Sequence, residues 1–259
     1  MDYLFDWIEK ILTRLKSAQS IFFFLDYDGT LTPIVPHPEQ AILSEKTKTL
    51  LLALKRNPKF LLAIVSGRSL KDIRNLVGLK NIYYVGNHGL EIFMPRRGIK
   101  QIISEEIFQG LSRIRKRLNH LLKDVDGIYI EDKGCILAIH YRNVDPGWVP
   151  SILKILAQEV KESVVPFSLS SGKKVFEIRP RSFVNKGTAV SEILRGMSPN
   201  GTLPVYIGDD QTDEDAFKAL KRKGMTIVVG VPSNSLAHYN LKDPSEVHEF
   251  LKIVQKELG

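Results

Sequence analysis

Short runs of apolar residues alternate with segments of helical periodicity in the first hundred residues of the chain. Uninterrupted apolar runs predict strands that are buried on both faces, whereas apolar residues repeated every three or four positions predict helices. The runs are 21–25, 60–65 and 82–85, and the helical segments between them are 44–55 and 69–77. Buried strands separated by helices form parallel sheets that are covered on both faces. The pattern therefore predicts an α/β domain.

The same alternation returns near the C-terminus, with a different pattern between the two parts. The late helices are expected at 186–195 and 214–220, and the late strands at 204–207 and 226–229. Between about 100 and 180 the order is helix, strand, strand, helix, strand, strand. The helices are 105–122 and 150–162, and the strands are 127–131, 135–141, 165–169 and 174–178. Such α+β character inside an α/β chain predicts an inserted domain.

The pattern divides the chain into a core, an insert and an N-terminal helix. The core is predicted to comprise residues 21–99 and 181–259, and the insert residues 100–180. In residues 1–20 apolar positions recur at helical spacing, so we expect a helix packed on the core. Its polar face carries both signs of charge, which disfavours a membrane anchor.

The composition indicates a globular protein that attracts anions. Hydrophobic residues make up 43% of the chain and charged residues 25%, which excludes an intrinsically disordered chain. No apolar run approaches the length needed to cross a bilayer. The formal charge of +8 suits an enzyme with an anionic substrate. The densest basic run, 113–117, falls in a predicted amphipathic helix, so we interpret it as a solvated helix face rather than a nucleic-acid site.

The single cysteine and the N-terminus bear on location. Cys135 lies in an apolar run and has no partner for an internal disulfide, so we expect a buried thiol in a reducing compartment. Asp2, Asp6 and Glu9 give the N-terminus a charge pattern unlike that of a secretory signal. We therefore expect a cytoplasmic monomer with a small-molecule substrate and neither nucleic acid nor membrane as a partner.

Polar and acidic residues follow four of the predicted core strands. The segments are 26–30 (DYDGT), 66–68 (SGR), 86–89 (GNHG) and 208–215 (GDDQTDED). Ligands of open α/β sheets lie beyond the carboxyl ends of the strands, so these segments should meet at one edge. Clustered carboxylates need a cation, and oxygen ligands suit Mg²⁺, whereas no His/Cys spacing favours zinc. DYDGT alone fits an ordinary turn; its occurrence with GDDQTDED favours a metal site.

These motifs resemble those of phosphatases of the haloacid dehalogenase superfamily, and more narrowly those of trehalose-6-phosphate phosphatases. The matching stretches run from Leu25 to Phe217 and are LDYDGTLTPI, VSGR, GNHGLE, HYR, GKKVFEIRP, NKG and GDDQTDEDAF. The resemblance implies a Rossmann-like hydrolase core with an inserted αββαββ cap that closes over the site. No catalytic position departs from the family pattern. Unlike some fused relatives, the chain is expected to carry no synthase domain ahead of this one.

The resemblance also implies roles for individual residues. Asp26 would attack phosphorus and form an aspartyl-phosphate, and Asp28 would act as general acid and then as general base. Mg²⁺ would be held by Asp26, the main-chain carbonyl of Asp28, and Asp209. Asp213 or Asp210 would support the ion directly or through water.

Phosphate and sugar contacts are implied in the same way. Ser66, which we expect at the start of a helix after a strand, and Lys186 would hold the phosphate. The alternatives are a helix N-cap for the serine and a solvated surface position for the lysine. Arg68, Asn87 and His88 are candidate substrate-binding residues, with a polar turn as the alternative for Asn87 and His88.

The insert supplies a second set of candidates. Lys173 and Glu177 would bind hydroxyls of the second sugar ring. His140 and Arg142 alternate with Tyr141 on a predicted strand and so should share a face, where Arg142 would assist or act structurally. The alternative for all four is an exposed sheet surface with weak cross-strand pairs.

Three rival functions stay open at this point. The substrate could be another phosphorylated disaccharide or a glycosyl glycerate phosphate. The chain could be a non-catalytic sugar-phosphate sensor, against which the intact set of Asp26, Asp28, Lys186 and Asp209 argues. It could also be a basic nucleic-acid-binding module, which salt-sensitive binding without phosphatase activity would reveal.

Overall fold

The computed structural model describes residues 1–259 apart from 103, 173, 182–183, 198–200 and 231–233. The chain forms two compact units. One comprises Met1–Lys100 and Val184–Gly259, and the other comprises Gln101–Phe183. The candidate chemistry of the strand ends lies in the first unit, the core.

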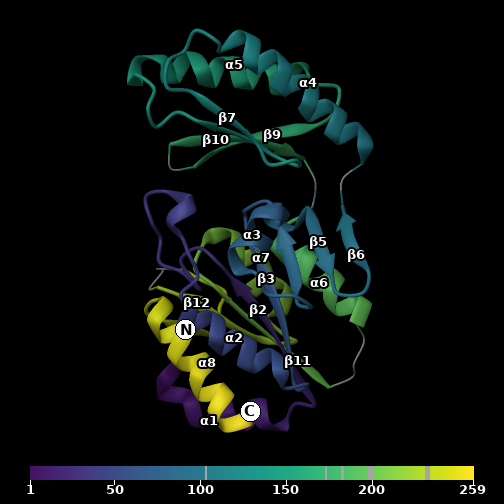
Figure 1. The fold of residues 1–259 in the computed structure, drawn as a ribbon, viewed down its shortest axis with the longest axis vertical. Coiled ribbons are helices and arrows are strands. Elements are labelled where there is room, and N and C mark those ends of the chain that lie inside the picture. The colour runs from purple at the N-terminus through teal and green to yellow at the C-terminus, as the bar shows by residue number, and fades with distance from the viewer. Residues whose placement is uncertain (103, 173, 182–183, 198–200, 231–233) are drawn as a thin grey trace. The chain divides into compact units, whose positions relative to one another are not determined.

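The core is built on a nine-stranded sheet (Figure 1). Its order is β1 (Asp2–Tyr3), β13 (Tyr239–Leu241), β12 (Met225–Val229), β11 (Thr202–Gly208), β2 (Ser20–Asp26), β3 (Phe60–Val65), β4 (Tyr83–Gly86), β5 (Glu91–Met94) and β6 (Gly98–Gln101). Neighbours from β1 to β4 pair in parallel, and β4 pairs with β5 in antiparallel fashion. The predicted parallel-sheet core is therefore confirmed.

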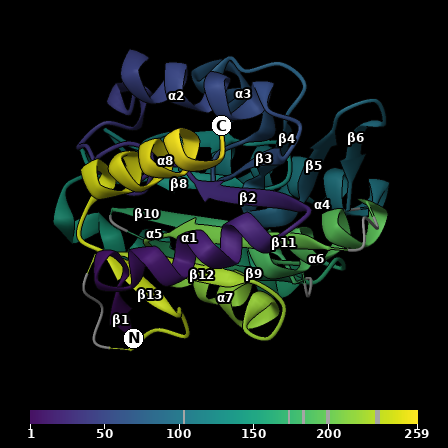
Figure 2. The same ribbon diagram turned by 90° about the horizontal axis from the view of Figure 1, so that it is seen from below.

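Helices cover both faces of this sheet (Figure 2). They are α1 (Ile8–Ser17), α2 (Glu45–Arg56), α3 (Leu70–Val77), α6 (Lys186–Met197), α7 (Glu214–Leu220) and α8 (Pro244–Leu258). The first three and α8 share one apolar cluster with alternate residues of β2, namely Ile21, Phe23 and Leu25. On the opposite face the ring of Phe24 stacks on that of Tyr206, which also meets Phe217 of α7. The continuous apolar run of β2 is thus buried on both faces, as its sequence predicts.

The insert has its own sheet and its own core. The elements follow the order α4 (Glu105–Leu121), β7 (Tyr129–Asp132), β8 (Leu137–His140), α5 (Val149–Glu162), β9 (Phe167–Gly172) and β10 (Val175–Pro180). The sheet order is β7-β8-β10-β9, with every pair antiparallel. Apolar residues of both helices and of one face of the sheet form a separate buried cluster. This is the predicted αββαββ arrangement.

The first residues differ from the helix that we expected over 1–20. Asp2–Tyr3 is a strand that extends the sheet beside β13, and a 3₁₀ turn over Leu4–Trp7 separates it from α1. The open edge of β13 supplies backbone partners, and Tyr3 Oη donates to Glu246 Oε1 at 2.8 Å. These tertiary contacts, and not the helical spacing of the apolar residues, determine the conformation of the first residues. The helix itself does pack on the core through Ile11, Leu12 and Leu15.

Short 3₁₀ turns lie between several elements. They are η1 (Leu4–Trp7), η2 (Pro38–Gln40), η3 (Asn87–Gly89), η4 (Pro146–Trp148) and η5 (Gln211–Asp213). Two of them, η3 and η5, lie just after core strands and carry predicted site residues. Within the part of the chain that the structure describes, no helix combines the length and the apolar character needed to cross a membrane.

Candidate active site

Adjacent core strands bring three of the polar segments to one edge of the sheet. Asp26 is the last residue of β2, and β2 lies between β11 and β3. Asp26 pairs in register with Val65, after which Ser66 follows, and Leu25 pairs with Ile207 close to the end of β11. Because these pairs are parallel, the tails of all three strands leave the sheet in the same direction.

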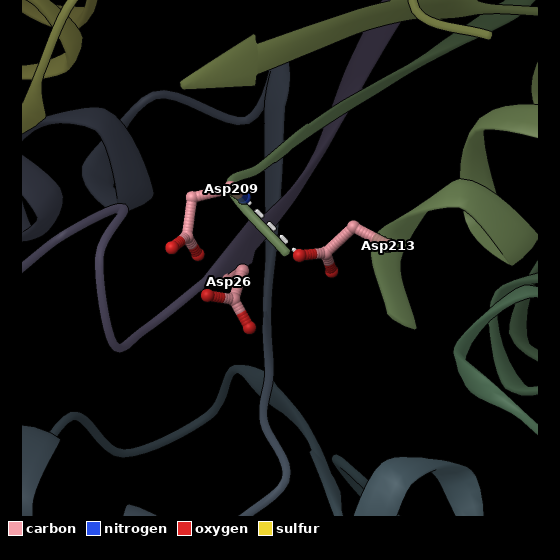
Figure 3. Close-up of side chains that lie close together, drawn as sticks. All are labelled: Asp26, Asp209 and Asp213. Atoms are coloured by element: carbon pink, nitrogen blue, oxygen red, sulfur yellow. Dashed lines mark hydrogen bonds between the residues drawn. The ribbon is translucent and has the colours of Figure 1, made fainter. Parts of the chain in front are cut away.

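Three carboxylates meet at this edge (Figure 3). Asp26, Asp209 and Asp213 each offer an oxygen atom within 4.8 Å of the other two. Asp26 is 4% exposed and Asp213 is fully buried. Three buried or half-buried acids of one sign are unfavourable together unless cations accompany them.

One of those cations is Lys186, the first residue of α6. Its Nζ donates to Asp26 Oδ1 at 2.7 Å and to Asp213 Oδ1 at 2.8 Å, and the residue is 3% exposed. Asn185 precedes the helix and accepts the backbone N–H of Thr188 at 2.9 Å, which caps the first turn. The alternative of a solvated surface lysine is therefore wrong.

Asp213 is held by four donors. Its Oδ1 accepts from Lys186 and from the hydroxyl of Tyr206 at 2.6 Å, while its Oδ2 accepts from the backbone N–H groups of Asp209 and Asp210 at 3.1 and 3.0 Å. This carboxylate therefore shapes the turn that carries Asp209 and fixes the ammonium beside Asp26. Tyr206 did not emerge as a site residue from the sequence; a hydroxyl two positions before the end of an apolar strand was the only signal.

Burial and mutual repulsion shift the pKa values of these groups. Burial raises the pKa of Asp26 well above its usual value, with Lys186 opposing this and Asp213 adding to it. Burial and then the Asp213 charge raise the pKa of Asp209 to about 6. Burial alone would lower the pKa of Lys186, but Asp26 and Asp213 raise it overall.

The charges of the cluster favour a divalent cation. Three carboxylates against one ammonium leave a net charge of −2 when all are ionised. The donors are all oxygen atoms, which is the ligand set that Mg²⁺ prefers. The residues present therefore fit a magnesium ion, with Asp26 and Asp209 as the carboxylates least occupied by protein donors.

Asp28 is paired with an arginine. Arg68 Nε donates to Asp28 Oδ2 at 2.7 Å and its Nη2 donates to Oδ1 at 2.5 Å, a two-bond fork. Asp28 stays 41% exposed in its side chain, so solvent and substrate can reach it. Gly29, which follows Asp28, adopts a φ of +85°, and a Cβ there would lie 2.0 Å from Asp209 Oδ2. Glycine is thus required for the close approach of Asp209.

The segment after β3 differs from our expectation. We predicted that Ser66 begins a helix, but α3 begins at Leu70 with Ser69 as its N-cap. Ser66 instead follows the last residue of β3, and its Oγ accepts the backbone N–H of Arg68 at 3.1 Å. The cap alternative for Ser66 therefore does not hold, and its buried hydroxyl faces the turn that positions Arg68.

Asn87 and His88 form a tight turn against the same segment. Both adopt left-handed backbone conformations, with φ of 48° and 55°. The backbone N–H of Asn87 donates to Arg68 O at 2.7 Å, and that of His88 donates to Ser66 O at 3.2 Å. Asn87 is fully buried and its Nδ2 donates to Glu91 Oε2 at 2.7 Å. Strained non-glycine residues of this kind gather at functional sites.

Two of the insert candidates, His140 and Glu177, lie on strands of the insert's own sheet. Glu177 is opposite Ala138 in register, which in turn is opposite Glu131. Glu177 accepts from Lys133 Nζ at 3.2 Å and from Arg179 Nη2 at 2.5 Å, while His140 Nε2 lies 2.9 Å from Glu131 Oε2. The sequence analysis did not single out Glu131. It lies two residues after Tyr129 on β7, and alternate residues of a strand share a face.

Arg142 and Lys173 are the other two insert candidates. Arg142 does not share a strand face with His140, because β8 ends at His140 and Arg142 lies in an exposed turn that the Val144 N–H to Tyr141 O bond closes. Lys173 lies outside the described residues.

Comparison with known proteins identifies the family. The model of the trehalose-phosphatase family matches residues 24–245. The chain is 36% identical over 269 residues to probable trehalose-phosphate phosphatase 2 of Oryza sativa subsp. japonica, covering 93% of this chain and 69% of that protein. It is 36% identical over 262 residues to trehalose-phosphate phosphatase B of Arabidopsis thaliana, covering 94% and 68%. Among solved structures, the C-terminal domain of trehalose-6-phosphate phosphatase from C. albicans superimposes with a TM-score of 0.78 at 26% identity, covering 96% of each chain. The chain therefore belongs to the trehalose-phosphatase family of phosphoric monoester hydrolases.

Proposed function

We propose that this protein hydrolyses trehalose 6-phosphate to trehalose and phosphate, with Mg²⁺, through an aspartyl-phosphate on Asp26. The observation that carries the proposal is the buried Asp26 at the end of β2, with one oxygen paired to Lys186 and two further carboxylates within 4.8 Å. Family membership and the names of the relatives support the substrate.

The first step uses the two aspartates of the DYDGT segment. The Asp26 oxygen that Lys186 does not bind attacks phosphorus, and the bond from phosphorus to the sugar oxygen breaks. Asp28 gives a proton to the departing sugar oxygen. Water then attacks the aspartyl-phosphate while Asp28 takes its proton, which releases phosphate and restores Asp26.

Neighbouring residues are proposed to hold the phosphate. Lys186 supplies a fixed positive charge, and the Ser66 hydroxyl, which accepts from Arg68 N–H, keeps its own proton for a phosphate oxygen. Asp26, Asp209 and the Asp28 carbonyl would hold Mg²⁺, which would supply positive charge where the phosphoryl group would otherwise be repelled. Because four donors already fill Asp213, we propose that it and Asp210 support the ion through water or by orienting Asp209.

Arg68 is proposed to change partners during the reaction. In this structure its guanidinium binds both oxygens of Asp28. A phosphate dianion offers Arg68 a stronger partner, and the move of Arg68 to the phosphate would free both Asp28 oxygens for the departing sugar oxygen. Arg68 thereby links arrival of substrate to readiness of the general acid.

Sugar contacts are proposed on both units. His88, in the strained turn after β4, would contact the ring nearest the phosphate, and the buried Asn87 would hold that turn in place. On the insert, Glu177 with Lys173 would bind hydroxyls of the second ring, with His140 and Arg142 as further contacts. Carboxylates and ammonium groups are suitable partners for sugar hydroxyls.

We also propose a cytoplasmic, monomeric enzyme without nucleic-acid or membrane partners. Cys135 is buried, which agrees with a reducing compartment. The basic run 113–117 lies on α4, where Arg115 pairs with Asp132 and Arg117 with Glu159 and Glu162. Ion pairs at two of the four cations of this run support a helix face rather than a nucleic-acid surface.

A phosphate-release screen tests the substrate. With Mg²⁺, we expect release from trehalose 6-phosphate to exceed that from glucose 6-phosphate, sucrose 6-phosphate and mannosyl-3-phosphoglycerate by a factor of about 100 or more in kcat/KM, since lost polar contacts to a sugar cost several kcal/mol. EDTA should abolish turnover and added Mg²⁺ should restore it. Equal rates on all four compounds would overturn the substrate, and full activity in EDTA would overturn the metal.

Removing the Tyr206 hydroxyl tests the role of the Asp213 network. Tyr206→Phe keeps the ring packed on Phe24 but deletes one hydrogen bond to a buried carboxylate, which is worth about 1.5–3 kcal/mol. We expect kcat to fall about tenfold and the Mg²⁺ concentration for half-maximal rate to rise, with KM for the sugar phosphate unchanged. Tyr84→Phe is the matched control, because that buried hydroxyl donates only to Leu79 O, at 2.7 Å. Equal effects of both variants would leave Tyr206 with a packing role alone.

A further inference from the structure

A groove of about 700 Å³ lies in the core unit along α3, away from Asp26. One wall is the α3 face with Lys71 and Arg74, and the other is formed by the edge strands β5 and β6, with Phe93 and Ile99. Small-molecule sites commonly have volumes of about 300–1,000 Å³ and combine an apolar floor with a few polar groups. The groove therefore has the size and lining of a ligand site.

The lining of the groove carries excess positive charge. Lys71, Arg74 and Lys80 contribute three cations and Glu91 one carboxylate, a net charge of +2 from 3 − 1. None of the three cations forms an ion pair with a residue in the described part of the chain. Arg74 lies over the Phe93 ring, with 4.1 Å from its Cζ to the ring centroid, so its guanidinium is fixed at the floor.

Glu91 does not cancel this charge, because it is turned to the catalytic side. Its Oε2 accepts from the backbone N–H of Leu70 at 3.2 Å and from Asn87 Nδ2 at 2.7 Å. It therefore ties the first residue of α3 to the strained turn that carries His88. The same helix follows the segment in which Arg68 pairs with Asp28.

We propose that this groove is a second binding site, for a phosphorylated small metabolite. The phosphate group binds among Lys71, Arg74 and Lys80, and the rest of the ligand lies on Phe93 and Ile99. Occupancy neutralises the cations of the groove, which Glu91 also lines, and so alters the bond from Asn87 to Glu91. Resting on the proposed function, the site regulates the phosphatase by changing KM rather than kcat, because Glu91 supports the sugar-side turn and not the Asp26–Lys186 pair. A shift of about fivefold in KM is expected, the lower end of typical coupling between sites.

Binding is measured first, by calorimetry on the full chain with Mg²⁺. The probes are inorganic phosphate, glucose 6-phosphate and AMP, which distinguish a free anion, a sugar phosphate and a nucleotide. Lys71→Ala combined with Arg74→Ala removes two charges from the groove. Lys46→Ala combined with Arg56→Ala removes two exposed charges from α2 and is the matched control. Far-ultraviolet circular dichroism checks that both double variants fold.

We expect at least one probe to bind at two sites on the wild type and on the control. On the groove variant the affinity of the groove site should fall tenfold or more, so that only the other site is detected. A single site on the wild type for all three probes, or a groove variant that binds as the wild type does, would overturn the proposal. Because none of the three probes is trehalose 6-phosphate, this result is independent of whether the chain hydrolyses that compound. The effect on KM is then measured with the probe that binds; an unchanged KM at saturation would overturn the regulatory part.

Discussion

Asp26→Asn should lower phosphate release from trehalose 6-phosphate by about 10⁴-fold or more, since removal of a covalent nucleophile typically has effects of this size or larger. The amide keeps the shape of the side chain and can still accept from Lys186, but it cannot form the aspartyl-phosphate. Steady-state phosphate release measures the loss, and Asp6→Asn, an exposed acid far from the strand ends in sequence, is the control. Activity within tenfold of the wild type would exclude Asp26 as the nucleophile.

The same variant should be more stable than the wild type when metal is absent. Burial raises the pKa of Asp26 and of Asp209, the latter to about 6. A carboxyl group whose pKa is raised in the folded state binds protons more tightly there, so its contribution to stability falls as the pH rises from about 4 through 6. In EDTA the thermal midpoint of Asp26→Asn should therefore exceed that of the wild type at pH 8 and approach it at pH 5. Mg²⁺ should reduce the difference in thermal midpoint between the variant and the wild type at pH 8, because it stabilises the wild type with its full set of carboxylates.

The sequence was sufficient to predict that the site lies at one edge of the sheet. Asp26, Ser66 and Asp209 each follow a fully apolar strand, and such strands pair in parallel because helices cover both faces. The tails of adjacent parallel strands leave in one direction, so their convergence follows from the pattern without coordinates. The αββαββ order of the insert could also be predicted, because the apolar residues of its two helices recur with a clear helical period.

Features that depend on tertiary contacts could not be predicted. Strands β5 and β6 are four residues each at the sheet edge, where mixed polarity leaves no periodic signal. The pairing of Arg68 with Asp28, the bonds of Asp213 to Lys186 and Tyr206, and the bond from Asn87 to Glu91 join residues whose separation in sequence carries no rule. Ser66 was misplaced because a serine after a strand often caps a helix, whereas here Ser69 does so.

Lys186→Met should destabilise the protein more than any surface substitution while leaving its shape intact. Methionine has about the length of lysine and fills irregular space well, so the change removes the charge without creating a large cavity. Lys186 is 3% exposed and is bonded to both Asp26 and Asp213. Breaking a buried ion pair by deleting one partner costs about 3–5 kcal/mol, because the remaining charge stays buried without compensation.

In EDTA at pH 8 this loss should lower the thermal midpoint by about 10 °C, given about 2–4 °C per kcal/mol for a chain of this size. The difference in thermal midpoint should shrink toward pH 5, because burial raises the pKa of Asp26, which then becomes protonated and no longer needs the ammonium. Mg²⁺ should restore part of the stability of the variant but not its rate. Its kcat should stay about 10²- to 10³-fold below that of the wild type, as expected when a fixed charge beside the transferring phosphoryl group is lost. Lys218→Met, an exposed lysine on α7, is the matched control and should change neither quantity. A Lys186→Met protein with the wild-type midpoint and rate would show that Asp26 does not depend on this ammonium, and the proposed clamp on the phosphate would have to be abandoned.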